Sequence, residues 1–218
     1  MDTNRLPAGS YNRVVGVQGP KDSGKTTLAI QLLQCSPGYQ IAVAARLPKK
    51  LPDGTPIRAT ECKAVKDIRS CLAWHSGNVV VVTAIGDKVI DETIAECRAI
   101  VASSIPRDKS SYIPCTILID EATRWQSALA GKMSASCMEF MGNSRHWGIG
   151  LIYCTQLARV IDEKVFALST EIYSFLTRNQ YDIQRLRASG EFTDEELRAL
   201  GELPRFSYVR KAIGEYGE

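Results

Sequence analysis

The sequence predicts an α/β domain in which helices flank a mostly parallel central β-sheet. Segments typical of strands and of helices alternate along most of the chain, and such alternation favours parallel strands joined by helical crossovers. One expected strand, residues 78–84, contains four consecutive valines and suits a strand buried on both faces. With 218 residues, 44% hydrophobic and 23% charged, the chain is expected to form one domain, residues 1–218.

A phosphate-loop motif separates the first expected strand, residues 14–17, from the first expected helix, residues 27–33. Residues 19–26 fit the pattern G-x-x-x-x-G-K-[ST] at each fixed position. In such a loop, backbone N–H groups and the N-terminus of the following helix face phosphate oxygens. The predicted nucleotide site consists of Gly19, Pro20, Lys21, Asp22, Ser23, Gly24, Lys25, Thr26 and Thr27. Lys25 is expected to reach the β- and γ-phosphates, and Thr26 to hold magnesium.

Residues 40–45 predict a second strand, and the next segment, residues 46–66, is expected to be an exposed loop. This segment holds six basic and two acidic residues, hence a charge of +4, whereas the whole chain carries +3. It also contains three prolines and a glycine, which are typical of loops. Two interpretations stay open: a solvated surface loop, or a loop that contacts nucleic-acid phosphates. No aromatic residue interrupts it, so base stacking is not indicated.

The next elements lead to an acidic pair. Helical spacing predicts helices at 64–75 and 91–103 around the strand at 78–84, and a polar loop at 105–111. The apolar strand 115–119 then ends in Asp120 and Glu121, and ligands bind at the carboxyl ends of strands in open α/β sheets. Asp120 fits the acid that holds magnesium through water, and Glu121 is placed to orient or deprotonate an attacking water.

A second polar strand end follows further along the chain. Residues 125–141 predict a helix, although Gly131 weakens that prediction. After a turn at 143–148, the strand 149–156 ends in Gln156, whose amide suits a hydrogen bond to the γ-phosphate or the attacking water. Four further elements are predicted: a short helix at 158–167, a strand at 171–176, a helix that begins with a capping box at 193–196 and ends at Gly201, and a strand at 206–210.

Composition excludes several classes of protein. Seven cysteines are scattered without a C-x-x-C pair, which favours reduced intracellular thiols over a disulfide or zinc framework. The balance of 27 basic and 24 acidic residues argues neither for nor against a nucleic-acid partner. No stretch approaches the ~18 apolar residues that a membrane span needs. A soluble, cytoplasmic protein is therefore expected.

The sequence resembles the FtsK-HerA superfamily of DNA-pumping ATPases in three motifs. These are the phosphate loop, the Asp120-Glu121 pair, and an Arg145-His146-x-Gly148 segment before the strand that ends in Gln156. The nearer branch is the genome-packaging ATPases of internal-membrane icosahedral viruses, which have about this length. The other is the zonula-occludens-toxin-like assembly ATPases of filamentous phages, which usually carry a transmembrane segment. The sequence departs from the commoner family pattern at residues 20–22, where small residues are frequent.

The resemblance implies a RecA-like, three-layer fold that binds ATP and Mg²⁺ and translocates double-stranded DNA into a capsid. It implies a homo-oligomeric ring, expected to be hexameric, located in the host cytoplasm or the virion without membrane insertion. A capsid-vertex or membrane-associated viral protein is a further expected partner. The implied catalytic residues are Lys25, Glu121, Gln156 and an arginine finger from a neighbouring subunit. Arg145 is the first candidate for the finger, and Arg178 and Arg124 remain open.

Two alternatives come from other classes of nucleotide-binding protein. The phosphate loop and residues 119–122 also resemble a thymidine-kinase-like nucleoside kinase, but the paired cysteines of its zinc site are missing. Residues 179–182, which read N-Q-Y-D, are similar to the guanine-reading N-K-x-D of GTPases but lack its lysine. Asp120 is also not followed by x-x-Gly. Both alternatives are therefore weaker than the ATPase hypothesis.

Overall fold

The computed structural model describes residues 13–74, 78–84, 86–104, 113–123, 125, 135–144 and 146–213. Within these residues, one sheet has the strand order β3-β4-β2-β5-β6-β1-β7-β8. The strands are β1 (Val14–Gln18), β2 (Tyr39–Val43), β3 (Ala59–Cys62), β4 (Val79–Val82), β5 (Cys115–Ile119), β6 (Ile149–Thr155), β7 (Glu171–Phe175) and β8 (Tyr208–Ala212). Neighbouring strands are parallel except β7 and β8, which are antiparallel. The predicted mostly parallel sheet is confirmed.

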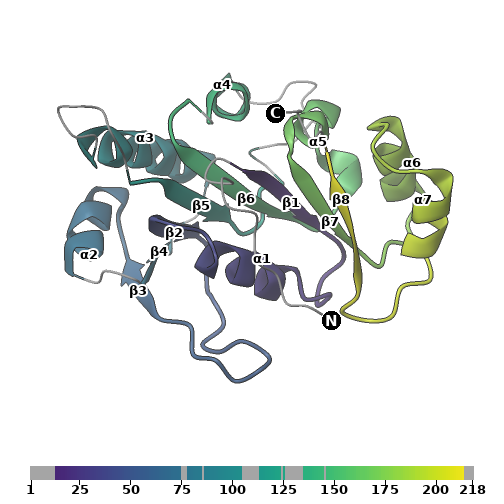
Figure 1. Cartoon of the computed structure of the whole chain (residues 1–218), viewed down its shortest axis with the longest axis horizontal. Helices are drawn as coiled ribbons and strands as arrows, with labels where there is room; N and C mark the ends of the chain where they lie inside the picture. The colour runs from purple at the N-terminus through teal and green to yellow at the C-terminus, as the bar shows by residue number, and fades with distance from the viewer. Residues whose placement is uncertain are drawn as a thin grey trace.

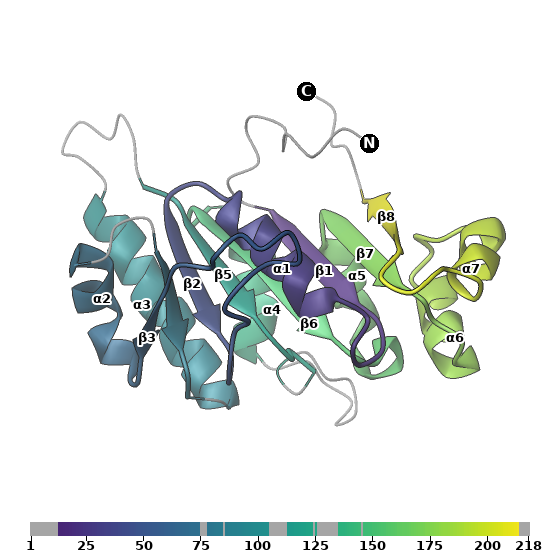
Figure 2. The same ribbon diagram turned by 90° about the horizontal axis from the view of Figure 1, so that it is seen from below.

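Helices cover both faces of the sheet (Figure 1). They are α1 (Lys25–Gln34), α2 (Ile68–Trp74), α3 (Asp87–Ser104), α4 (Ala135–Asn143), α5 (Glu163–Leu168), α6 (Gln180–Ala188) and α7 (Asp194–Leu200). Figures 1 and 2 show α1 on one face and α3, α4 and α5 on the other, with α6 and α7 beyond the β7–β8 edge. The predicted three-layer arrangement is confirmed. None of the helices in the described part of the chain is long and apolar enough to cross a membrane.

The four valines of β4 show how a central strand serves both layers. Val79 and Val81 belong to the core beneath α1, whereas Val80 and Val82 belong to the core beneath α3. All four side chains are buried, and burying such a side chain contributes about 1.5–3 kcal/mol. Neither face of β4 is exposed to solvent, so the run lacks the alternation of polar and apolar residues that a strand with one solvent-exposed face shows.

Two of the sequence-based element predictions are wrong. Residues 59–62 form the edge strand β3 inside the segment predicted as a loop. Only one of its four side chains is buried, so it lacks the apolar pattern by which a strand is predicted. The helix predicted at 158–167 is broken into a 3₁₀ turn (Ala158–Val160) and α5. Asp162 starts α5 by accepting a 2.9 Å hydrogen bond from the Lys164 N–H, an N-cap that interrupts a continuous helix.

Helix α6 was not predicted, and it explains the N-Q-Y-D segment. The Asn179 side chain caps α6, with its oxygen accepting the N–H groups of Tyr181 at 2.9 Å and Asp182 at 3.4 Å. The segment is thus a helix N-terminus in this fold. The capping box of α7 is confirmed, because Thr193 and Glu196 exchange both of its hydrogen bonds.

Two other predictions fall partly or wholly outside the described residues. The predicted helix at 125–141 is described at Trp125, which lies in a turn, and from Ala135 onward, where α4 begins. The predicted loop at 105–111 lies outside the described residues, so it stays a prediction.

Candidate nucleotide site

The phosphate loop joins the end of β1 to the start of α1, which begins at Lys25. A Cβ atom on Gly19 would lie 2.6 Å from the Phe175 Cβ, so only glycine fits there. Gly24 has φ 100° and Asp22 has φ 61°, both in the left-handed region. Aspartate tolerates that region better than most residues. The left-handed backbone at this position explains why Asp22 occurs in a loop where the resembling family frequently has small residues.

Lys25 is held inside the loop. Its side chain is only 8% exposed, and its Nζ donates a 2.6 Å hydrogen bond to the Pro20 carbonyl. Burial lowers the pKa of Lys25, while the nearby Cys154, Glu121 and Asp120 groups raise it and so oppose that effect. The ammonium group is therefore poorly hydrated and is available to an anion bound in the loop.

Ser23 carries a buried hydroxyl that has no hydrogen-bond partner among the described residues. The residue is only 7% exposed. Leaving a buried polar group unsatisfied costs about 1–3 kcal/mol. A phosphate oxygen in the loop would satisfy this hydroxyl, so the site fits a bound polyphosphate.

Thr26 and Asp120 bring a hydroxyl and a carboxylate together. Thr26 Oγ1 donates to Asp120 Oδ1 over 3.1 Å. Burial raises the pKa of Asp120, and the hydrogen bond from Thr26 partly offsets this. No cluster of three or more potential metal-ligating His, Cys, Asp or Glu side chains occurs in the described residues. The hydroxyl and carboxylate oxygens of this pair fit Mg²⁺, which typically takes one or two protein oxygens and completes its shell with phosphates and water.

Glu121 is fixed both by its backbone and by its side chain. Its φ of 72° is unusual for a residue other than glycine, and such strain, which costs about 1–3 kcal/mol, clusters at functional sites. Gln156 Nε2 donates to Glu121 Oε2 at 2.7 Å, and the Thr123 hydroxyl donates to Glu121 Oε1. Thr123 also lies 3.3 Å from the Thr155 hydroxyl. The carboxylate is held in one position by donors from two segments.

The strand order brings these groups together. β6 lies between β1, which leads into the phosphate loop, and β5, which ends in the acidic pair. The Gly19 N–H donates to the Thr155 carbonyl at 3.2 Å, so Gln156 follows directly after the contact between β6 and the loop. The predicted residues Lys25, Thr26, Asp120, Glu121 and Gln156 therefore meet in one site. Sequence reasoning missed Thr123, whose only signal is its place two residues after Glu121.

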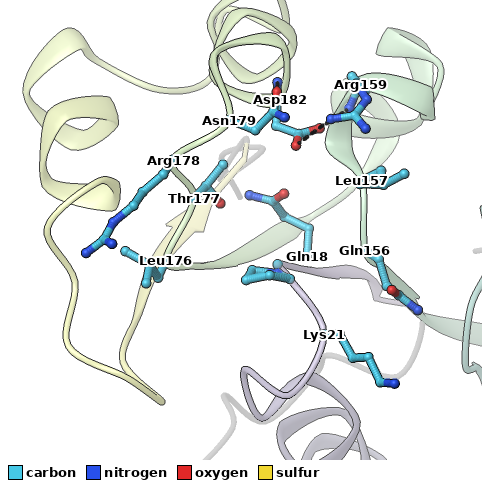
Figure 3. A pocket seen from close by; sticks show the side chains of 12 residues that line it. Gln18, Lys21, Gln156, Leu157, Arg159, Leu176, Thr177, Arg178, Asn179 and Asp182 are labelled. Atoms are coloured by element: carbon cyan, nitrogen blue, oxygen red, sulfur yellow. Dashed lines mark hydrogen bonds and ion pairs between the residues drawn. The ribbon is translucent and has the colours of Figure 1, made fainter.

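A pocket of ≈ 380 Å³ lies beside the loop at the ends of β1, β6 and β7. Figure 3 shows Lys21 and Gln156 on one side of it and Arg159, Asn179 and Asp182 on another. Arg159 is paired with the buried Asp182 carboxylate at 3.3 Å.

The three arginine-finger candidates stand differently in the structure. Arg178 lines this pocket, and its Nε donates to the Gly201 carbonyl of the same chain at 3.2 Å. Arg145 and Arg124 lie outside the residues that the structure describes.

The fold is that of a RecA-like P-loop NTPase. A phosphate loop precedes α1, two acids follow β5, and a glutamine follows β6, which lies between β5 and β1.

No family model matches the sequence, and no curated protein matches it either. Among solved structures, the chain is similar to the genome packaging NTPase B204 from Sulfolobus turreted icosahedral virus 2. Its sulfate complex has a TM-score of 0.71 and 19% identity, covering 93% of this chain and 92% of that chain.

Two further complexes of the same B204 protein agree. The ATP-gammaS complex has a TM-score of 0.71 and 19% identity, with 94% of each chain covered. The AMP complex has a TM-score of 0.69 and 20% identity, covering 93% of this chain and 94% of that chain. This likeness, over nearly the whole of both chains, establishes the fold that the motif resemblance implied.

Proposed function

We propose that the chain is an ATPase that hydrolyses ATP with water as the nucleophile. The observation that carries this proposal is the Glu121 carboxylate, which accepts a 2.7 Å hydrogen bond from Gln156 beside the 3.1 Å Thr26–Asp120 pair. A carboxylate oriented in this way suits a general base that positions water. A nucleoside kinase would instead have to direct an acceptor hydroxyl to the γ-phosphate.

Each group of the site has a role that follows from its chemistry. Lys25 and the loop N–H groups would hold the phosphates, and Thr26 and Asp120 would hold magnesium. When bound there, magnesium would supply positive charge that offsets the negative charge of the phosphates. Glu121 orients water and accepts its proton, while Gln156 links Glu121 to the γ-phosphate position.

The proposal extends to movement of double-stranded DNA into a capsid. Fold similarity to a genome packaging NTPase supports this step. A second support is the segment 46–58, which is both anchored and basic. Lys50 and Pro56 form a β-bridge within it. Leu47 and Leu51 pack against the core beneath α1. The segment is therefore anchored, and it presents exposed basic side chains: Arg46, Lys49, Lys50 and Arg58. Such groups suit contact with DNA phosphates.

The proposed assembly is a homo-oligomeric ring, with hexamers expected, in which a neighbouring arginine completes each site. Arg145 remains the first candidate for this finger. A capsid-vertex or membrane-associated viral protein is the proposed docking partner, and the host cytoplasm or virion the proposed location. An arginine finger accelerates phosphoryl transfer by about 10³–10⁵, so isolated subunits are expected to turn over slowly.

The test measures ATP consumption with and without double-stranded DNA, and with thymidine as a phosphate acceptor. We expect phosphate release that DNA stimulates and no thymidine monophosphate. Thymidine monophosphate formed in step with ATP consumption would establish the kinase instead. Absence of ATP consumption under all three conditions would overturn the proposed activity.

A further inference from the structure

A second pocket, of ≈ 390 Å³, opens along the N-terminal end of α1. It is lined by the phosphate-loop residues 22–27 and by Arg205 and Phe206, which come from the segment between α7 and β8. Two distant parts of the chain thus line the same pocket: one suited to phosphates, the other aromatic and cationic.

Phe206 does not behave as a core residue. Its side chain is 60% exposed, and its backbone has φ 68°, which is unusual for a bulky residue. The turn that carries it is closed by a 3.1 Å hydrogen bond from the Ser207 N–H to the Pro204 carbonyl. Its ring edge lies 3.3 Å from where a Cβ on Gly24 would be. The ring is therefore placed directly beside the phosphate loop.

Arg205 adds a second planar group to this wall of the pocket. Its guanidinium carbon lies 4.7 Å from the centre of the Phe206 ring. Phenyl rings and guanidinium planes are both groups on which nucleic-acid bases stack.

The loop residues that line the pocket independently favour a bound phosphate. The buried Ser23 hydroxyl, which lines this pocket, has no partner in the described residues. The N-terminus of the ten-residue helix α1 faces the same space, and it favours an anion. A ligand that satisfies both parts of the pocket has a polyphosphate at one end and a planar ring at the other.

We propose that this pocket is the nucleoside half of the site, in which the base stacks on Phe206 and Arg205 while the phosphates occupy the loop. The inference rests on the proposed binding of a nucleoside triphosphate and adds the residues that hold its base. A phenyl ring has no hydrogen-bonding atom, so Phe206 stabilises adenine and guanine alike.

The test compares two probes by calorimetry in the presence of Mg²⁺: AMPPCP, which carries a base, and inorganic tripolyphosphate, which does not. The variant Phe206→Asn removes the ring and keeps a residue type that tolerates left-handed backbone. We expect it to weaken AMPPCP binding about 5- to 150-fold, as loss of base stacking does, and to leave tripolyphosphate binding unchanged. GMPPCP should weaken by a similar factor.

Two further variants serve as controls. Phe206→Trp should restore AMPPCP affinity, because indole also stacks. Tyr181→Ala removes an aromatic side chain that is 69% exposed on α6, and it should change neither probe.

Unchanged AMPPCP affinity in Phe206→Asn would overturn the inference. Equal weakening of both probes would also overturn it, because the ring would then act on the loop and not on a base. AMPPCP binding that depends on Phe206 in a protein that does not consume ATP would support the inference and reject the proposed hydrolysis.

Discussion

The side-chain amide of Gln156 donates a 2.7 Å hydrogen bond to the Glu121 carboxylate. The two residues follow the ends of neighbouring strands, because Ile119 of β5 pairs with Tyr153 of β6. On its other side, β6 pairs with β1, where Thr155 is opposite Gln18. A single side chain therefore connects the proposed base to β6, the strand that lies next to β1 and the phosphate loop.

Replacing Glu121 with glutamine should abolish most turnover and leave nucleotide binding intact. Glutamine keeps the size of the side chain but cannot accept the proton of an attacking water. General-base catalysis contributes about 10²–10⁴ in rate, so we expect kcat to fall by at least about 100-fold. Phosphate release measures turnover, and AMPPCP titration measures binding. Turnover equal to that of the wild-type protein would rule out Glu121 as the base.

Replacing Asp120 with asparagine should stabilise the protein in a pH-dependent way. Burial raises the pKa of Asp120 above its ordinary value of 3.8. Because the folded-state pKa is the higher one, the charged carboxylate destabilises the fold above both pKa values, and this effect disappears as the pH falls through them. We expect Asp120→Asn to be more stable than the wild-type protein at pH 7 and to lose this advantage toward pH 4. Urea unfolding across that range measures it.

Magnesium provides the control for the Asp120 variant. With nucleotide present, added Mg²⁺ should stabilise the wild-type protein more than Asp120→Asn, since a ligand stabilises the state that binds it. A stability difference that stays constant from pH 7 to pH 4 would contradict the assignment to the titration of Asp120.

Neutralising Lys49 and Lys50 should weaken the response to DNA and leave basal turnover unchanged. Both side chains are exposed on the anchored segment 46–58. Each lost phosphate contact lowers the slope of log affinity against log salt by about 0.9, so the double glutamine variant should lose about 2 from that slope. Lys88 and Lys164, exposed on α3 and α5, provide a matched double variant. An equal loss in both double variants would assign the effect to net charge alone.

Replacing Arg145 with alanine should abolish turnover, and mixing with Glu121→Gln subunits should partly restore it. The reason is geometric: in a mixed ring, an intact site can receive its arginine from a Glu121→Gln neighbour. ATP turnover measured across mixing ratios checks this expectation. Arg178→Ala is the variant to compare with Arg145→Ala in the same mixing experiment. Arg178 is held within its own subunit, because its side chain donates to the Gly201 carbonyl of the same chain. Failure of the mixture to regain activity would argue against action in trans.

Local sequence patterns predicted the elements whose signal is contiguous. The strand–loop–helix arrangement around residues 19–26, the buried β4 valines and the α7 capping box each depend on residues close together in the chain, and all are confirmed. Strand β3 and helix α6 were missed because neither has a clear apolar pattern in its own sequence. Among the described residues, β3 lies at the edge of the sheet, pairs only with β4 and has one buried side chain. Helix α6 has a low apolar content, with only Asp182 and Leu186 buried.

The sequence by itself determined the candidate groups for the proposed chemistry: Lys25 and Thr26 in a phosphate loop, an acidic pair after one apolar strand, and Gln156 after another. Tertiary structure alone decided that these groups meet, because strand order depends on pairing between segments far apart in the chain. It placed β6 between β1 and β5, held Glu121 in left-handed backbone, and brought Phe206 beside Gly24. No local pattern contains those relationships, since each depends on side chains and backbone from separate elements packing together.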